Sequence, residues 1–506
     1  MSQLSSLARL LAVETGRAQP VRTVRHVHLS DRPLVLVTAQ LAGEACAPLA
    51  VLAGDDRARP RLLVVYEPRN RTQRFTWAAD LAEIVLGYLD RYAVEVKDQD
   101  PDIEPGAAKP EPAPDAPQLL VPNPQTVGFL RLLGRSTRFR KTAGEYAVPE
   151  AVPLLGRWLT YYSERTEVTP SALLLPLTAV LTDHWASGQS ATEDANLGAL
   201  LGWIDPPDGH TGQQAARIAE DPVRCPPAGP VTDPAWDNDV LVHLTAAIRD
   251  ATASGDGAAL ARAQAAMDGA LRSQLQPTWE LMWQGIDLLR ELPEAASVPR
   301  RWEGDRRSFT STVQWFRQGG APQPRRDSAV SAARRLARLE REQQQMVVQC
   351  AFDDPLVLAE YRLTGEAFAG QVTWTDPARL DDSGSRAVPR PLITMATEDE
   401  VIIETGAELK SPARPGQKVI LKEVLPPESP GGTTYVTLEL ISGMGHGRTP
   451  RPGSIPEFGE ELTYTSLSDE FQRPPQFPER EETPWTHGGP PVDYVPTDDD
   501  AREDWS

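Results

Sequence analysis

Residues 96–117, VKDQDPDIEPGAAKPEPAPDAP, constrain the architecture of this chain more than any other stretch. Six prolines alternate there with acidic residues, and such a sequence has few apolar side chains to bury. Proline also holds the backbone extended, so the stretch predicts a semi-rigid linker. A chain of 506 residues is too long for one ordinary core. We therefore expect a multidomain α+β protein with a first boundary at this linker.

The segment before the linker, residues 1–95, predicts a small α+β domain. Apolar and β-branched runs at 21–29, 33–41 and 61–67 indicate strands, and residues 77–92 have apolar positions at helical spacing. Residues 118–298 predict a helical domain. Asp256 precedes one helical pattern as a candidate N-cap, and Pro277 stands at the expected start of another. Short joints between such helices favour a helical bundle.

Residues 299–327 form a connector rich in arginine and aromatic residues, followed by a helical stalk at 328–368. The stalk carries apolar residues at alternating spacings of three and four, and Asp354-Pro355 opens a second helix. Residues 369–445 predict a small five-stranded barrel of the OB or SH3-like kind, because closure removes exposed strand edges. Its expected strands are 370–374, 391–397, 400–405, 417–425 and 433–441.

Residues 446–506 lack a sustained period and predict a disordered acidic tail. Aromatic residues spaced through acid are common in short partner-binding segments, although a tail that only increases solubility remains the alternative. The candidate partner-binding residues are Phe471, Phe477, Trp485, Tyr494 and Trp505.

The most distinctive signal is electrostatic. The formal net charge is -20, yet residues 300–342 contain eleven arginines and no lysine. Guanidinium groups bind phosphate bidentately and stack on bases, so two basic clusters predict contact with nucleic acid, single-stranded in particular. The alternative is that these arginines pair with acids of the same chain. The candidates are Arg300, Arg301, Arg306, Arg307, Trp315, Arg317, Arg325, Arg326, Arg334 and Arg335 in one cluster, and Arg131, Arg135, Arg138, Arg140 and Lys141 in the other.

Motifs for known chemistries are missing from the sequence. It has no P-loop, no GxGxxG that follows a strand, no nucleophile elbow, no HExxH and no EF-hand loop. We therefore expect no cofactor, no metal ion and no motor ATPase activity. Three cysteines without CxxC spacing fit a reducing compartment, and no apolar run reaches eighteen residues. A cytoplasmic protein that does not bind membranes is expected.

Three weaker groupings keep an enzyme open as the alternative. His26 and His28, with Asp31 close by, would project from one face of a strand and suggest a metal or phosphoesterase site. A second set resembles the spaced carboxylates and lysine of restriction-type nucleases. Its carboxylates would have to lie on adjacent strands to bind one Mg²⁺. This set is Asp399, Glu408 and Lys410. A possible hydrolase set is Asp183, His184 and either Ser163 or Ser171.

Residues 328–445, a long charged helix, a short helix and a barrel that ends on LELISGMG, resemble the stalk-and-barrel accessory module of superfamily-one helicases of the nonsense-mediated-decay type. In that family the module sits on a motor core and helps to grip single-stranded nucleic acid. The resemblance covers under a quarter of the chain, and the family's motor domain does not follow here. It implies an accessory protein that lacks a motor.

Together these features predict a non-catalytic adaptor or accessory subunit that contacts nucleic acid, an ATPase or helicase-like partner, or both. Genome maintenance and defence against foreign DNA are the settings that such a protein suits. A metal-dependent nuclease or other hydrolase is one alternative, and a scaffold that contacts only proteins is the other.

Overall fold

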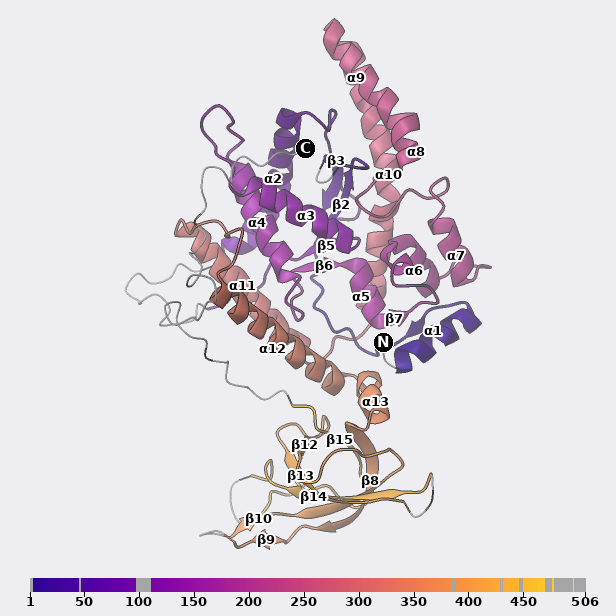
Figure 1. Ribbon diagram of the computed structural model, residues 1–506, viewed down its shortest axis with the longest axis vertical. Helices are drawn as coiled ribbons and strands as arrows, with labels where there is room; N and C mark the ends of the chain where they lie inside the picture. Colours follow the sequence, from indigo (N-terminus) through magenta and orange to yellow (C-terminus); the bar gives the residue numbers. More distant parts are fainter. Residues whose placement is uncertain are drawn as a thin grey trace, which may run out of the picture.

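The computed structural model describes residues 3–44, 47–96, 111–383, 387–427, 429, 431–445, 449–468, 476 and 495. Figure 1 shows a large body and, below it, a small barrel that is joined to the body through two helices, α12 and α13. The chain therefore has the mixed α+β composition that the sequence predicts.

A five-stranded sheet with the strand order β4-β3-β2-β5-β6 lies at the centre of the body. Its strands are β2 (Leu34–Gln40), β3 (Pro48–Gly54), β4 (Arg61–Val64), β5 (Leu119–Val121) and β6 (Leu174–Pro176). β2 pairs antiparallel with β3 and parallel with β5, which is parallel to β6. All but the last residue of β2 and of β3 are buried, as expected for a sheet that is covered on both faces.

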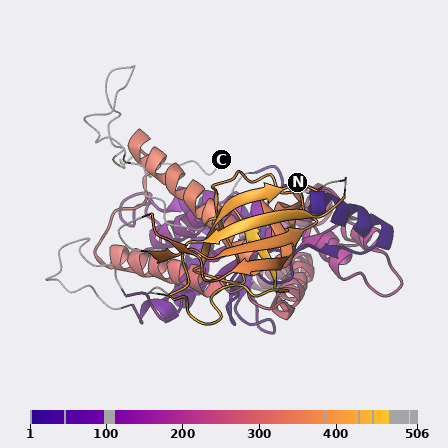
Figure 2. The ribbon, with the colours of Figure 1, turned by 90° about the horizontal axis from the view of Figure 1, so that it is seen from below.

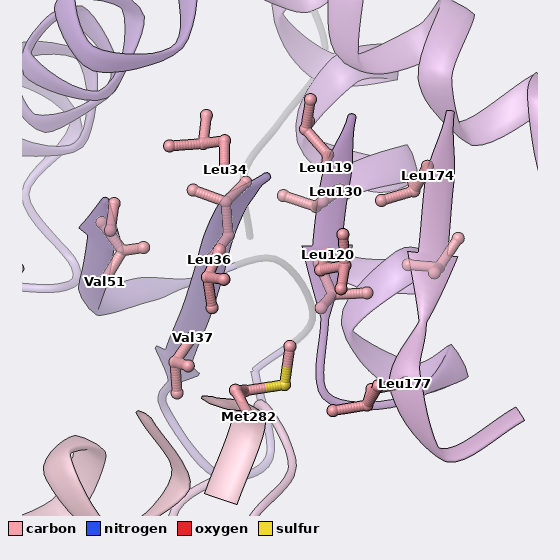
Figure 3. Packing of buried hydrophobic residues seen from close by; sticks show 14 of the residues in the cluster. Leu34, Leu36, Val37, Val51, Leu119, Leu120, Leu130, Leu174, Leu177 and Met282 are labelled. Atoms are coloured by element: carbon pink, nitrogen blue, oxygen red, sulfur yellow. The ribbon is translucent and has the colours of Figure 1, made fainter. Parts of the chain in front are cut away.

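The sheet crosses the expected boundary between residues 1–95 and 118–298. β5 and β6 come from the second segment, and Leu34 and Val35 of the first pair with Leu119 and Leu120. One hydrophobic cluster accordingly runs from Ala12 to Val313, so the two segments share a core. Figure 3 shows side chains of β2, β5 and β6 in this core together with Met282 of α10 (Gly257–Glu291).

Helices supply the rest of the body, as the helical pattern of residues 118–298 predicts. They are α1 (Gln3–Thr15), α2 (Arg71–Ala93), α3 (Pro124–Thr137), α4 (Ala151–Arg165), α5 (Leu177–His184), α6 (Leu197–Ile204), α7 (Gly212–Ala219), α8 (Pro234–Trp236), α9 (Val242–Ser254), α10 and α11 (Val298–Arg317), with short turns η1 (Glu193–Ala195) and η2 (Asp237–Leu241) and the paired strands β1 (Gln19–Pro20) and β7 (Trp185–Ala186). Asp256 caps α10, as predicted, by accepting hydrogen bonds from the N–H groups of Ala258 and Ala259. Pro277 was expected to begin a new helix but lies inside α10. The helix continues past it because Trp279 and Met282 in the following turn are fully buried in the core.

Most of the expected connector is helix α11, and two of its aromatic side chains belong to the core. Trp302 is 8% exposed and Phe309 is fully buried. The end of the expected linker packs against this helix, because the N–H of Ala113 donates to the Thr310 hydroxyl at 2.9 Å and Ala116 is fully buried. Residues 97–110 of the linker lie outside the described residues.

The predicted stalk consists of α12 (Ala329–Asp353) and α13 (Pro355–Leu363). The buried residues of α12 all lie near its C-terminal end, at Val348, Gln349 and Ala351. Leu336, in the predicted apolar stripe, is 58% exposed. The packed part of α12 is therefore its base, and Figure 2 shows the remainder extending at an angle to α11.

The barrel is closed by six strands, where five were expected, with the ring order β11-β14-β13-β12-β15-β8. The strands are β8 (Ala367–Asp376), β11 (Leu392–Thr397), β12 (Glu408–Lys410), β13 (Lys418–Leu425), β14 (Thr434–Leu440) and β15 (Glu461–Thr465), and the pair β9 (Leu380–Asp381) and β10 (Val388–Pro389) extends the loop from β8 to β11. Four expected strands are present as β8, β11, β13 and β14. The expected strand at 400–405 is a loop, from which Val401 and Ile403 pack on the barrel core.

β15 lies in the segment that was expected to be a disordered tail from residue 446. It pairs with β8 over five residues and contributes Tyr464, which is fully buried. Residues 469–506, apart from Gln476 and Val495, lie outside the described residues, and so do all five candidate partner-binding aromatics. Among the helices that the structure describes, none combines the length and apolar character that crossing a membrane requires.

Candidate nucleic-acid interface

A groove lies between α12 on one side and the ends of α4 and α11 on the other. It consists of two cavities of about 550 and 210 Å³ that share Arg165 and Val168 in their walls. The helices are joined at the base of the groove, where Arg301 of α11 donates to Oε1 of Gln349 at 2.8 Å. Figure 2 shows the two helices running at an angle to each other. We call this space the stalk groove.

Three cations face the stalk groove without a partner among the described residues. Arg334 and Arg338 line the larger cavity from α12, one turn apart, and Arg300 lines the smaller cavity from α11. All three side chains are exposed, and the structure gives them no hydrogen bond or ion pair within the described part of the chain. They can therefore receive an anion without first giving up an interaction.

Two of the four acids that line the groove, Asp305 and Asp327, already have partners. Asp305 accepts from Arg165 at 2.8 Å, from the Ser171 hydroxyl at 2.7 Å and from the N–H of Ala172 at 2.6 Å. Burial raises the pKa of Glu164, because the charged form of a buried carboxyl is poorly solvated.

Asp327 lies 3.4 Å from Arg335, so its charge is also offset. Glu342 lines the smaller cavity, and its Oε2 is buried without a hydrogen-bond partner. Six arginines line the groove against four acids, so positive charge is in excess there.

The two basic clusters of the sequence meet beside this groove. The carboxylate of Glu167 bridges them, with one oxygen 3.2 Å from Arg131 of α3 and the other 2.5 Å from Arg335 of α12. Arg138 reinforces the contact by donating to the carbonyl of Gln323 at 3.0 Å. Residues about two hundred positions apart in the sequence thus form one surface, a contact that the two clusters in the sequence did not predict.

Several candidate residues serve the fold through hydrogen bonds to the chain itself. These residues with their partners are Arg301 with Gln349 and the His26 carbonyl, Arg306 with the Pro114 carbonyl, Arg307 with Glu303, Arg317 with the carbonyls of Ala93 and Val96, Arg138 with the carbonyls of Gln323 and Pro324, and Arg140 with the Ser136 carbonyl. Arg325 and Arg140 also lie over aromatic rings, those of Phe139 and Phe75. The structure therefore divides the candidate arginines into anchored and available groups.

The remaining candidates lie on the surface and do not line the groove. Arg135 and Arg326 are exposed and have no partner among the described residues. Lys141 is also exposed, on the loop after α3. Trp315 is 52% exposed, with its ring N–H donating to the Ala321 carbonyl at 3.1 Å. The indole is thus held in place while part of its surface stays open.

The two N-terminal histidines do not form a joint site. The expected strand at 21–29 is absent, and each ring has a different partner. His26 Nε2 lies 3.4 Å from Asp354, whereas His28 stacks on Trp302 with 4.0 Å between ring centroids. Burial lowers the pKa of His28.

The expected nuclease carboxylates lie on opposite sides of the barrel. Asp399 follows β11 and Glu408 begins β12, and two strands separate β11 from β12 in either direction around the ring. Asp399 accepts two hydrogen bonds from Arg362, and Glu408 lies 2.9 Å from Lys418. No group of three metal-binding side chains occurs in the described part of the chain.

The residues of the expected hydrolase set likewise have other hydrogen-bond partners. Ser171 donates to Asp305, while Ser163 donates to the Leu159 carbonyl. His184 instead accepts a hydrogen bond from the N–H of His26.

Sequence reasoning missed Arg165 and Glu167, which organise the groove. Both stand in the short mixed-charge stretch Glu164-Arg165-Thr166-Glu167 at the end of α4, outside the two arginine clusters, so no local pattern singled them out. No family model matches the chain, and neither a curated protein nor a solved structure is similar to it at a significant level.

Proposed function

We propose that this chain is a non-catalytic adaptor that binds the phosphate backbone of nucleic acid in the stalk groove. The observation that carries the proposal is the placement of Arg300, Arg334 and Arg338, exposed and without described partners, on facing walls of one groove. Phosphate contacts of this kind are independent of base sequence and sensitive to salt. Trp315 offers an exposed aromatic surface at the end of α11 that suits stacking of an unpaired base.

The non-catalytic part of the proposal rests on what the candidate reactive groups do. Asp354 accepts hydrogen bonds from Thr23, and Asp305 accepts from Arg165 and Ser171. In the barrel, Arg362 holds Asp399 with two hydrogen bonds. Each of these carboxylates joins separate segments of the chain, which is a structural role.

An ATPase or helicase-like partner follows from the resemblance of residues 328–445 to helicase accessory modules. A groove that grips nucleic acid without motor motifs would act beside a motor that another chain provides. Genome maintenance and defence against foreign DNA are the settings we propose for such a pair. The aromatic residues of the acidic C-terminal segment are our proposed contacts for the partner protein.

Binding of a fluorescent single-stranded oligonucleotide tests the nucleic-acid part of the proposal. We expect the triple variant Arg300→Gln, Arg334→Gln, Arg338→Gln to bind about tenfold more weakly at low salt. The slope of log K against log salt should fall by about 2, because each single-strand phosphate contact contributes about 0.7.

A matched control removes three positive charges elsewhere. Arg217, Arg262 and Arg272 are exposed, lie on α7 and α10 and have no partner among the described residues. Replacing all three by Gln should leave the salt slope unchanged. Equal losses of affinity in both triple variants would show that binding depends only on net charge. Absence of binding by the unmodified chain would favour the protein-only scaffold.

A further inference from the structure

The chain leaves the barrel next to the base of the stalk groove. After β15, the N–H of Ser466 donates to the Glu366 carbonyl at 3.1 Å, and Leu467 packs in a cluster with Cys350 and Phe352 at the end of α12. Gln349, the neighbour of Cys350, lines the smaller cavity. The segment that begins at residue 469 therefore starts beside the groove.

This segment has the charge that the groove lacks. Residues 469–506 contain eleven acidic residues and three arginines. The acids fall into the groups Asp469–Glu470, Glu479–Glu482 and Asp498–Asp504, with Asp493 between the last two. Carboxylates form charge-assisted, often bidentate hydrogen bonds with guanidinium groups, as phosphates do.

The segment is also long enough to reach every available arginine. From Cys350 to Arg334, the most distant of the three along α12, the helix rises about 24 Å, at 1.5 Å per residue. An extended chain covers that distance in about seven residues. The acidic group at 479–482 lies more than ten residues beyond Ser468, so it can lie along the whole groove.

We propose that residues 469–506 dock in the stalk groove of their own chain and neutralise Arg300, Arg334 and Arg338. The docking involves only this chain and stands without nucleic acid. Its regulatory consequence rests on the proposed function: a polyanion must displace the C-terminal segment before it can bind the same arginines.

Photo-crosslinking in the full-length chain tests the docking directly. Phe471 and Trp485 each follow an acidic group, and either can be replaced by benzoylphenylalanine. Irradiation should give intramolecular crosslinks to peptides within 298–317 and 329–349. Because the attraction is between charges at a solvent-exposed groove, the yield should fall about fivefold in 0.5 M salt.

Charge reversal provides the decisive comparison. The variant Arg300→Glu, Arg334→Glu, Arg338→Glu should lose these crosslinks, while Arg217→Glu, Arg262→Glu, Arg272→Glu should retain them. The proposal would be overturned by crosslinks to the barrel or to a second copy of the chain. Groove crosslinks that persist unchanged in the charge-reversed variant would overturn it too.

Oligonucleotide affinity separates this inference from the proposed function. Replacing Glu479, Glu481 and Glu482 by Gln should strengthen oligonucleotide binding about fivefold if the segment competes for the groove. Crosslinks to the groove in the unmodified chain, with no oligonucleotide binding even after Glu479, Glu481 and Glu482 are replaced by Gln, would support docking and refute the proposed function. Oligonucleotide binding without such crosslinks would do the reverse.

Discussion

The carboxylate of Asp354 accepts two hydrogen bonds from Thr23, one from the backbone N–H at 2.7 Å and one from the hydroxyl at 2.9 Å. The same carboxylate caps α13 by accepting from the N–H of Leu356 at 2.9 Å. Asp354 is fully buried, and His26 Nε2 lies 3.4 Å from it. One side chain thus fastens the start of the barrel module to the N-terminal segment of the body.

Asp354→Asn should weaken this joint in a pH-dependent way. Burial alone would raise the pKa of Asp354, but hydrogen bonds from His26, Thr23 and Leu356 lower it well below its ordinary value. The charged form therefore stabilises the fold above the unfolded pKa near 4, and this contribution is lost as the pH falls further. We expect the variant to be less stable by about 2 kcal/mol at pH 6, with a smaller difference at pH 3. Urea unfolding at both pH values would measure it, and a pH-independent difference would contradict the assignment.

His184 should make stability fall on mild acidification. Burial is the largest cause that lowers its pKa to about 4. Because the folded pKa lies below the unfolded value near 6.5, the neutral form stabilises the fold fully above pH 6.5 and the benefit declines toward pH 4. A shift of this size corresponds to about 3 kcal/mol. His184→Gln should flatten the unfolding free energy between pH 7 and 4.5, whereas His210→Gln, at an exposed histidine, should reproduce the unmodified profile.

Substitution of Arg301 should lower stability, whereas substitution of Arg300 should affect only oligonucleotide binding. Arg300 is exposed and lacks a described partner, whereas Arg301 donates to Gln349 and to the His26 carbonyl. Arg301→Gln should lower stability by about 1–3 kcal/mol because buried acceptors lose their donor. Arg300→Gln should leave the melting temperature unchanged and weaken oligonucleotide binding. Thermal unfolding with fluorescence anisotropy would distinguish them, and an equal stability loss in both would show that Arg300 is also anchored.

Tyr464 should contribute to the barrel through its ring alone. The side chain is fully buried, and its hydroxyl has no hydrogen-bond partner. Tyr464→Phe removes a buried polar group that gains nothing, so stability should stay the same or rise by about 1 kcal/mol. Tyr464→Ala should cost about 3–5 kcal/mol through the cavity that it leaves. Calorimetry would measure both, and a clear loss in the Phe variant would indicate a bound water or another partner.

Gly156 should not tolerate a methyl group. A Cβ at this position of α4 would lie 2.4 Å from the backbone nitrogen of Arg138, at the contact between α3 and α4. Gly156→Ala should therefore destabilise the body by about 1–3 kcal/mol. A Cβ at Gly128 of α3 meets nothing within 4 Å, so Gly128→Ala should stabilise the protein by about 1 kcal/mol. Denaturant unfolding of the two variants would give opposite signs.

Long periodic segments were predictable from the sequence, and short ones were not. The alternation in β13 and β14 and the helical spacing of α12 each extend over many residues, and all three elements are present. β5 and β6 contain three residues each, too few to show a period, so the shared core of the body was missed. β15 has only five residues and lies among acidic ones, so the sequence analysis assigned it to the disordered tail.

The sequence could single out an arginine-rich candidate region, but it could not predict what each arginine contacts. The density of arginine singles out 300–342 as a candidate interface, but neighbouring arginines differ in what they contact. Whether a guanidinium meets a carbonyl or solvent depends on segments far away in the chain, such as His26 for Arg301 and Ala93 for Arg317. Local composition cannot predict those long-range contacts.

The position of β15 makes the barrel sensitive to damage near its end. β15 closes the ring by pairing with both β8 and β12, so its removal would open the ring and expose one edge on each of these strands. Unpaired strand edges recruit strands from other molecules. A proteolytic cut in the stretch between β14 and β15 would thus turn a self-contained module into a surface for aggregation, although the rest of the barrel sequence would be intact.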